Sequence, residues 1–150
     1  MIDREANAVA LFSRFAAIPG IITASRFFRA WAEVGAAEQP ALFMVGSSEE
    51  PQVRERGLPT VWKVKHKVFL YTRHDPSFIE SPAVTQNGLL SALESALEAQ
   101  AGEDASAFYT TLGGKVSRAY ISDPIVKDEG TEGGQGVAVF SVEYIASAGG

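Results

Sequence analysis

The sequence contains no cysteine, which excludes disulfide bonds, thiolate nucleophiles and thiolate metal sites. A chain without cysteine suits a reducing cytoplasm or a particle assembled there. The sequence also lacks any apolar run near the roughly 20 residues that a membrane-spanning helix needs. Its N-terminal stretch carries Asp3 and Glu5 ahead of the apolar residues. We therefore expect neither a secretory signal nor a membrane as partner.

Histidine is nearly as scarce, since His66 and His74 are the only two. Neither stands in a local pattern that pairs a nucleophile with a base, so we predict structural or surface roles for both and no catalysis. A small cytosolic hydrolase or nucleotide-binding enzyme that uses His66 or His74 with nearby carboxylates remains the alternative. No cofactor is predicted.

The chain also lacks an excess of basic residues, because 13 lysines and arginines face 18 acidic residues, a formal charge of −5. This balance argues against a general nucleic-acid binder, whose affinity comes largely from cations facing phosphates. Phe27, Phe28 and Trp31, interleaved with Arg26 and Arg29, form the best local candidate for stacking on bases. We prefer core packing for these aromatic residues, and a small nucleic-acid-binding module remains a further alternative.

An acidic group could in principle bind a hard cation through oxygen ligands. Its spacing does not match the calcium-loop pattern, so we predict a solvated connection between strands and no metal. The glycine-rich stretches 112–114 and 130–136 lead into expected strands and not into helices, which favours turns over phosphate-binding loops. The acidic group consists of Asp123, Asp128, Glu129 and Glu132.

A length of 150 residues fits a single domain, and we assign residues 1–150 to one. Helices are predicted over 3–17, stopped by Pro19 and Gly20, and over 83–99. Residues 47–57, which are polar and contain proline, are predicted to form an exposed hairpin loop. The predicted strands cover 22–31, 40–46, 61–71, 115–122 and 135–145. This order lacks both strand–helix alternation and internal repeats, so we predict an α+β fold with an antiparallel sheet of four to five strands and two helices on one face.

The two predicted helices differ in their apolar residues. For the first helix, we expect a buried stripe made by Ala6, Val9, Ala10, Phe12, Ala16 and Ala17. For the second helix, we expect one made by Val84, Leu89, Leu90, Leu93, Ala96 and Leu97.

The strand 61–71 alternates apolar residues with lysine: Trp62, Val64, Val68 and Leu70 fall on one side, and Lys63, Lys65 and Lys67, here called the lysine row, on the other. Alternation of this kind predicts a strand with one face in the core. With both helices on that face, the lysine row lies on the second face of the sheet, which is free for partners together with the sheet edges. Carboxylates are expected opposite the lysines, with Glu143, Glu49, Glu50 and Glu55 as candidates.

Several features taken together resemble the tail-completion or tail-terminator proteins of long-tailed bacteriophages and prophages. They are an opening helix that ends in residues 18–20, Arg26, Trp31, the string EQPALF at 38–43, the long strand 62–71, the turn and strand start at 112–116 and a final alternating strand. The similarity covers nearly the whole chain and includes no catalytic signature.

This resemblance implies a virion assembly protein and no enzyme. Such proteins form a hexameric ring on the end of the tail tube, stop tube polymerisation and provide the surface for head joining. The implied partners are further copies of the chain, the tail tube protein, a head-tail connector or head-completion protein, and DNA passing through the lumen. The implied location is the virion tail, assembled in the host cytoplasm. Related connector and neck proteins share similar folds, so that ring position stays open.

A closed ring places equivalent surfaces of each subunit toward the axis or toward a neighbour. Our hypothesis is that Lys63, Lys65 and Lys67 face a subunit boundary or the lumen as a strongly positive belt, against the alternative of a solvated outer face. The loops 47–57 and 127–136 are the candidates for partner contact, because polar loops commonly order on binding. Their charged residues are Glu49, Glu50, Arg54, Arg56, Asp128, Glu129 and Glu132.

Overall fold

The computed structural model describes residues 1–150 except 53–54, 74–82, 105, 130–133 and 148–150. The described chain forms two α-helices, two short 3-10 helices and six strands. In order these are α1 (Arg4–Ala16), β1 (Thr23–Ser25), η1 (Trp31–Glu33), η2 (Ala36–Glu38), β2 (Ala41–Gln52), β3 (Val61–Arg73), α2 (Ala83–Ala96), β4 (Arg118–Ile121), β5 (Val126–Glu129) and β6 (Gln135–Ser147).

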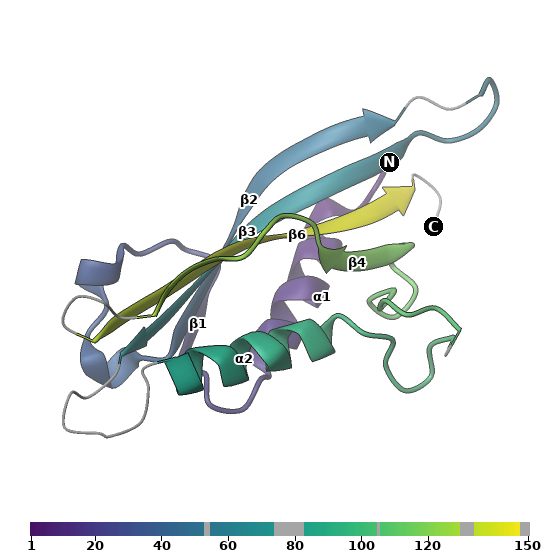
Figure 1. Ribbon diagram of the computed structural model, residues 1–150. Helices are drawn as coiled ribbons and strands as arrows, with labels where there is room; N and C mark the ends of the chain where they lie inside the picture. Colours follow the sequence, from purple (N-terminus) through teal and green to yellow (C-terminus); the bar gives the residue numbers. More distant parts are fainter. Residues whose placement is uncertain (53–54, 74–82, 105, 130–133, 148–150) are drawn as a thin grey trace.

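All six strands belong to one sheet with the order β1-β2-β3-β6-β4, in which β5 also pairs with β6. Every pairing is antiparallel except that of β1 with β2. Both helices lie on one face of this sheet (Figure 1). The prediction of an α+β fold with two helices on one face of an antiparallel sheet is confirmed, and the sheet has one strand more than the upper number expected.

Helix α1 starts where the carboxylate of Asp3 accepts a hydrogen bond from the backbone N–H of Ala6, at 3.0 Å. The predicted apolar stripe is confirmed only in part: Ala10 and Phe12 pack against the core, whereas Val9 is 46% exposed and Ala16 and Ala17 are exposed as well. Leucine and phenylalanine side chains bury more apolar area than the alanines of the predicted stripe, so they determine which side of the helix meets the sheet. The buried residues of α1 are Asn7, Ala8, Leu11 and Phe15.

Helix α2 follows its predicted stripe except at its first turn. Val84 is 56% exposed, whereas Gln86 is fully buried and donates from Nε2 to the carbonyl of Asp128 at 3.0 Å. This bond joins the helix to strand β5, so a polar residue occupies the place expected for an apolar one. Leu89, Leu90 and Leu93 are buried as predicted.

Strand β3 lies between β2 and β6 and has the alternation predicted from its sequence. Val64, His66 and Val68 are buried beneath the helices, and the lysine row points to the opposite face. The main core fills the space between helices and sheet, and its largest fully buried side chains include Tyr144, Phe15, Phe140, Leu11, Leu42 and Met44.

Strand β2 continues well beyond its predicted end. Residues 47–52, predicted as loop, form its second half, with Ser48 opposite Lys65 and Gln52 opposite Val61 after a bulge between Gly46 and Ser48. The polar, proline-containing composition describes an exposed edge strand as well as it describes a loop. The hairpin of β2 and β3 is therefore longer than predicted, and its tip projects from the body of the protein (Figure 1).

The predicted strand 22–31 is mostly wrong. Only Thr23–Ser25 is a strand, and it pairs in parallel with Ala41, Leu42 and Phe43. Residues 26–39, here called the cover segment, then leave the sheet edge and pack on the face opposite the helices. There Phe28 packs against Phe69, with ring centroids 4.8 Å apart.

A second, smaller core lies under the cover segment. Its buried residues are Val34, Ala41, Phe43 and Tyr71, with Trp31, Phe69 and Val137 packed around them. The Tyr71 hydroxyl donates to the carbonyl of Arg29 at 2.8 Å, and the Arg73 guanidinium lies 5.1 Å from the centre of the Trp31 ring. The sheet is thus covered by helices on one face and by irregular chain on part of the other.

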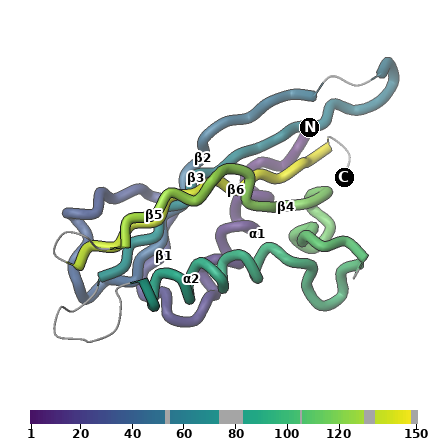
Figure 2. The backbone as a smooth tube through the Cα atoms, in the orientation of Figure 1, coloured from purple at the N-terminus to yellow at the C-terminus, as the bar shows by residue number. Residues whose placement is uncertain are grey.

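The acidic connection predicted between the last two strands contains β5, which pairs with residues Gly136 to Val139 of β6. Figure 2 shows β4 and β5 following one another along the same side of β6. Strand β5 has only four residues, three of them charged and all exposed. So short a segment shows no alternation of apolar and polar residues, and its sequence therefore did not indicate a strand.

Candidate interaction surfaces

The face of the sheet opposite the helices, here called the open face, is divided into two halves. Along β3 its residues are Lys63, Lys65 and Lys67 and then Phe69 and Tyr71. The aromatic half is covered by the cover segment, whereas in the lysine half Lys65 and Lys67 line an open pocket of about 440 Å³ with Ser47, Ser48 and Asp123. The lysine row therefore lies on an uncovered sheet surface, as predicted from the alternation.

The three lysines have different surroundings. Lys65 Nζ lies 3.3 Å from a carboxylate oxygen of Asp123, and hydrogen bonds from the Ser141 and Lys65 side chains lower the pKa of that carboxyl. Lys67 is exposed, and its Nζ lies 5.5 Å from the centre of the Phe69 ring. Lys63 faces Glu50 across the β2–β3 pairing. Of the three, Lys67 is the most accessible to a partner.

Carboxylates lie beside the lysines, as expected. Glu50 and Glu143 were among the predicted ones, whereas Asp123 was not. Glu50 stands opposite Lys63, and Glu143 stands opposite Lys65 but accepts a hydrogen bond from the Tyr120 hydroxyl. Burial and this contact with Glu143 raise the pKa of Tyr120 to about 12. The uncovered half of the open face thus mixes both signs of charge and is not a purely positive belt.

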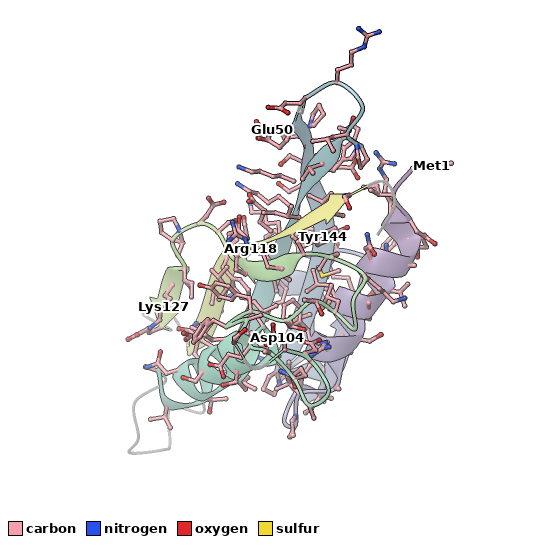
Figure 3. All side chains as sticks on the ribbon, turned by 90° about the vertical axis from the view of Figure 1, so that its right-hand side faces the viewer. Met1, Glu50, Asp104, Arg118, Lys127 and Tyr144 are labelled. Atoms are coloured by element: carbon pink, nitrogen blue, oxygen red, sulfur yellow. The ribbon has the colours of Figure 1, made fainter. Side chains whose placement is uncertain are left out.

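Glu49 lies on the other face of the hairpin. It pairs with Arg4 of α1 at 2.7 Å, and the Arg4 guanidinium also lies 5.2 Å from the centre of the Trp62 ring. Glu49 therefore fastens helix to sheet. Glu50 lies near the projecting end of the hairpin (Figure 3), and Arg56 is exposed in its turn. Arg54 lies outside the described residues.

On the second predicted contact loop, Asp128 and Glu129 belong to strand β5 and are exposed. Glu129 forms an ion pair with Lys127 at 3.1 Å, and Lys127 Nζ donates to Asn87 Oδ1 of α2 at 2.7 Å. Glu132 lies outside the described residues. The prediction of loop residues is thus wrong for Asp128 and Glu129, although their exposure leaves them accessible to a partner.

His66 is buried, at 7% exposure, and stacks on Tyr144 with ring centroids 5.5 Å apart. Its Nε2 lies 3.5 Å from the Tyr144 hydroxyl, and its Nδ1 has no hydrogen-bond partner among the described residues. Burial, with the charge of Arg26, lowers the pKa of His66. His66 is therefore a core residue held neutral at pH 7. His74 lies outside the described residues.

The aromatic and arginine group suggested for base stacking is largely occupied by contacts within the protein. Arg26 pairs with Glu5 at 2.6 Å, and Arg29 pairs with Glu38 at 3.0 Å. Phe28 packs on Phe69. Phe27 is different, because its side chain is 79% exposed.

A pocket of about 270 Å³ opens at the β4 edge of the sheet, and we call it the edge pocket. It is lined by Glu94, Leu97, Phe108, Tyr109, Ile121 and Ile125. Leu97 is buried at its base, and Phe108 stands at its rim with 66% exposure. No pattern in the sequence indicates this pocket, because its walls come from α2, β4 and two connecting segments that meet only in the folded chain.

Glu103 holds the wall of the edge pocket in shape. The chain turns back after α2, so that Ala99 N–H donates to the carbonyl of Phe108 and Thr110 N–H donates to that of Leu97. Inside this turn, the Glu103 carboxylate accepts hydrogen bonds from the loop 97–114 and from Arg14 of α1. The donors and distances are Gln100 N at 3.1 Å, Thr110 Oγ1 at 2.9 Å, Thr111 N at 3.3 Å, Gly113 N at 3.2 Å and Arg14 Nη2 at 3.2 Å.

Two opposing effects act on the Glu103 carboxyl. Burial raises its pKa, and the hydrogen bonds from Gln100, Gly113, Thr110 and Thr111 lower it, with a net pKa of about 2. The carboxylate therefore stays charged through the physiological range and organises the loop as a fixed acceptor.

Two further properties concern the part of the chain that the structure describes. No cluster of three or more histidine or acidic side chains there is arranged to hold a metal ion. No helix there is both long and apolar enough to cross a membrane.

Comparison of the chain with protein-family models and with curated proteins finds no match. The similarity to tail terminators noted above therefore stays an expectation, based on residue order and spacing.

Proposed function

We propose that this protein is a virion assembly protein of the tail-terminator type, which caps a tail tube as a ring and offers a surface for head joining. The observation that carries the proposal is the uncovered half of the open face, a polar sheet surface that continues onto a projecting hairpin. A surface of this form suits contact between folded proteins. The resemblance to tail terminators suggests which proteins these are: further copies of the chain, the tail tube protein and a head-completion protein.

The outer edge of β2 supports contact through side chains more than through strand addition. Beyond Phe43, where β1 ends, this edge has no strand beside it among the described residues. It carries a bulge after Gly46, two consecutive glutamates and Pro51. These are the devices by which edge strands resist pairing with other chains. A partner is therefore expected to bind on the open face and not to extend the sheet at β2.

The charges of the uncovered half favour a protein partner over DNA. Its cations are Lys63, Lys65, Lys67 and Arg118, and its carboxylates are Glu50, Asp123 and Glu143. DNA affinity depends on neutralising phosphates with free cations, and here carboxylates offset most of the positive charge. Alternating signs instead provide the complementary pattern that fixes register between two protein surfaces.

The function is tested by deleting the gene in the bacterium that carries it and examining induced particles by electron microscopy. We expect tails of irregular, excessive length without heads, and restoration of joined, uniform tails by the wild-type gene. Tails of normal length that lack heads would place the protein at the neck. Normal, joined particles in the deletion strain would refute the proposal.

The surface is tested with Lys67→Glu, because Lys67 is exposed and forms no ion pair with a described carboxylate. We expect this variant to fold like the wild type and to fail in complementation. Lys115→Glu, a charge reversal at an exposed lysine between α2 and β4 and outside the proposed contact surfaces, is the matched control for reversal of a lysine. Full complementation by Lys67→Glu would remove the lysine row from the proposed contact.

A further inference from the structure

Two apolar features remain without a partner at opposite edges of the sheet. Phe27 follows β1, the strand at one edge, and the edge pocket is lined by Ile121 of β4, the strand at the other. A single exposed apolar side chain is common on protein surfaces and means little alone. An apolar ring at one edge together with a pocket for such a ring at the other is a more specific arrangement.

Phe27 is presented on ordered backbone. Its N–H donates to Ser25 Oγ at 2.9 Å, and the next residue, Phe28, is anchored on Phe69. With the chain fixed on both sides, the Phe27 side chain extends from the surface, 79% exposed. Little conformational entropy is lost when a side chain on fixed backbone enters a pocket.

The edge pocket has the size and lining to take an aromatic ring. Its volume is about 270 Å³, whereas an apolar cavity of about 150 Å³ is enough to bind benzene. Its lining is aliphatic and aromatic apart from Glu94. Phe108 and Tyr109 meet edge to face, with centroids 4.9 Å apart, and a third ring can add to this cluster in the same way.

We propose that Phe27 of one copy of this protein inserts into the edge pocket of the next copy. Because the ring and the pocket are different surfaces of the same chain, the contact is heterologous and repeats from copy to copy in one direction. Repetition of such a contact closes a ring when the rotation between copies allows it. The inference rests on the proposed function for its biological setting and deepens it by naming the residues that join the subunits.

Charged side chains rim both apolar surfaces. Arg26 and Arg29 flank Phe27 and are already paired within the chain, with Glu5 and Glu38, and Glu94 is the charged residue of the pocket lining. The two arginine side chains are still 37% and 32% exposed, and a guanidinium has five N–H donors, so a further carboxylate such as that of Glu94 can join either ion pair. An apolar centre with a polar, charged rim is the usual anatomy of a specific interface.

The first experiment replaces Phe27 with the photoreactive analogue benzoylphenylalanine in the full chain. Irradiation of concentrated protein is expected to yield a covalent dimer, with cross-links mapped by mass spectrometry to Leu97, Phe108 or Ile121 of the second copy. The same analogue at Val84, which is also exposed but lies at the start of α2, is the control. A cross-link at another surface, or no dimer, would overturn the inference.

The second experiment uses two variants that each damage one side of the contact. Phe27→Asp removes the ring, and Phe108→Asp places a charge at the pocket rim; both positions are exposed, so the fold is expected to persist. Each variant alone should lose self-association by at least about tenfold, the effect of leaving a phenylalanine in water. Mixed together they should form a one-to-one pair and no larger species, because one intact ring then meets one intact pocket. Absence of the mixed pair would contradict a heterologous contact.

These results are separable from those on function. If cross-links map to the pocket but the deletion strain makes normal particles, the contact stands and the tail function fails. If the deletion strain shows the tail defect but the cross-links map elsewhere, the function stands and this contact is wrong.

Discussion

The cover segment and the loop 97–114 are both irregular stretches packed against the sheet, but they are fastened in opposite ways. The cover segment is held by rings: Phe28 on Phe69, Trp31 beside Arg73, and Val34 against the small core. The loop is held by one carboxylate, that of Glu103, which gathers its donors from four loop residues and from Arg14. Apolar fastening is insensitive to pH, whereas fastening by a carboxylate depends on its charge. The cover segment also contains a carboxylate, that of Glu38, but its bonds with Arg29 and Gly35 lie within the segment and do not attach it to the sheet.

This difference matters because the proposed interface uses both stretches. Phe27 is presented by the cover segment, and Phe108 and Tyr109 are presented by the loop. The attachment of the cover segment to the sheet should therefore withstand acid, whereas the loop 97–114 should lose its shape there.

The largest expected effect comes from the core beneath the cover segment. Phe43→Ala removes a side chain that is fully buried there, and such a truncation typically costs about 3–5 kcal/mol. Chemical denaturation followed by circular dichroism measures the change in unfolding free energy. Ile22→Ala, a truncation at an exposed apolar position before β1, is the control and should change little. A loss below about 1 kcal/mol for Phe43→Ala would show that the cover segment is not fastened by this core.

The second largest effect is expected from the Glu103 carboxylate, which holds the loop 97–114, and it appears as a dependence of stability on pH. A shift of the Glu103 pKa from 4.5 to about 2, at about 1.4 kcal/mol per unit, corresponds to at most about 3 kcal/mol of stability. Since the folded-state pKa is the lower one, this contribution is present above pH 4.5 and is lost as pH falls from there toward 2. We expect wild-type stability to fall in that window.

Glu103→Gln should remove the Glu103 contribution to this pH dependence and be less stable at pH 7, because an amide is a weaker acceptor than a carboxylate. Glu98→Gln, an exposed glutamate of the same region, is the matched control and should keep the wild-type profile. Equal acid sensitivity of Glu103→Gln and wild type would break the contrast between the two stretches.

The sequence predicted best those elements in which apolar and polar residues alternate regularly along the chain. Alternation along residues 61–71 identified β3 and the side of the lysine row, because one buried face imposes a period of two. The prediction of a strand over the cover segment was wrong because its position depends on contacts distant in the sequence. Aromatic residues at 27, 28 and 31 are typical of strands, but their place is decided by Phe69 and Tyr71, on a strand far along the chain.

The candidate site was predictable to a similar extent. The lysine row was found, whereas the edge pocket was not, since Leu97, Phe108 and Ile121 share no pattern in the sequence. Glu103 was also missed, because a glutamate that collects hydrogen bonds from later turns looks like any other surface acid. The local sign of a chain reversal around Glu103 is the presence of Gly102, Gly113 and Gly114, which all have positive φ.

A smaller effect is expected at the hydrogen bond that ties the cover segment to β3. Tyr71→Phe removes the donor to the Arg29 carbonyl and keeps the ring in the small core. A bond of this kind contributes about 0.5–1.5 kcal/mol. Denaturation should show a loss in this range, and Tyr109→Phe, whose ring is partly exposed at the pocket, is the comparison. No measurable loss would mean that the rings alone hold the cover segment.

The smallest effects are expected in the lysine row itself. Lys67→Ala removes an exposed side chain and a ring contact worth about 0.5 kcal/mol at such sites. Lys65→Ala also breaks the ion pair with Asp123, for which exposed pairs give at most about 1 kcal/mol. Both variants should therefore stay close to wild type in chemical denaturation, with Lys65→Ala the less stable. Since the uncovered half of the open face needs no lysine for folding, any failure of these variants in tail assembly would report a lost contact with a partner. A loss above about 2 kcal/mol for Lys67→Ala would instead make the lysine row part of the fold, and the contrast between a covered and an uncovered half of the sheet would no longer hold.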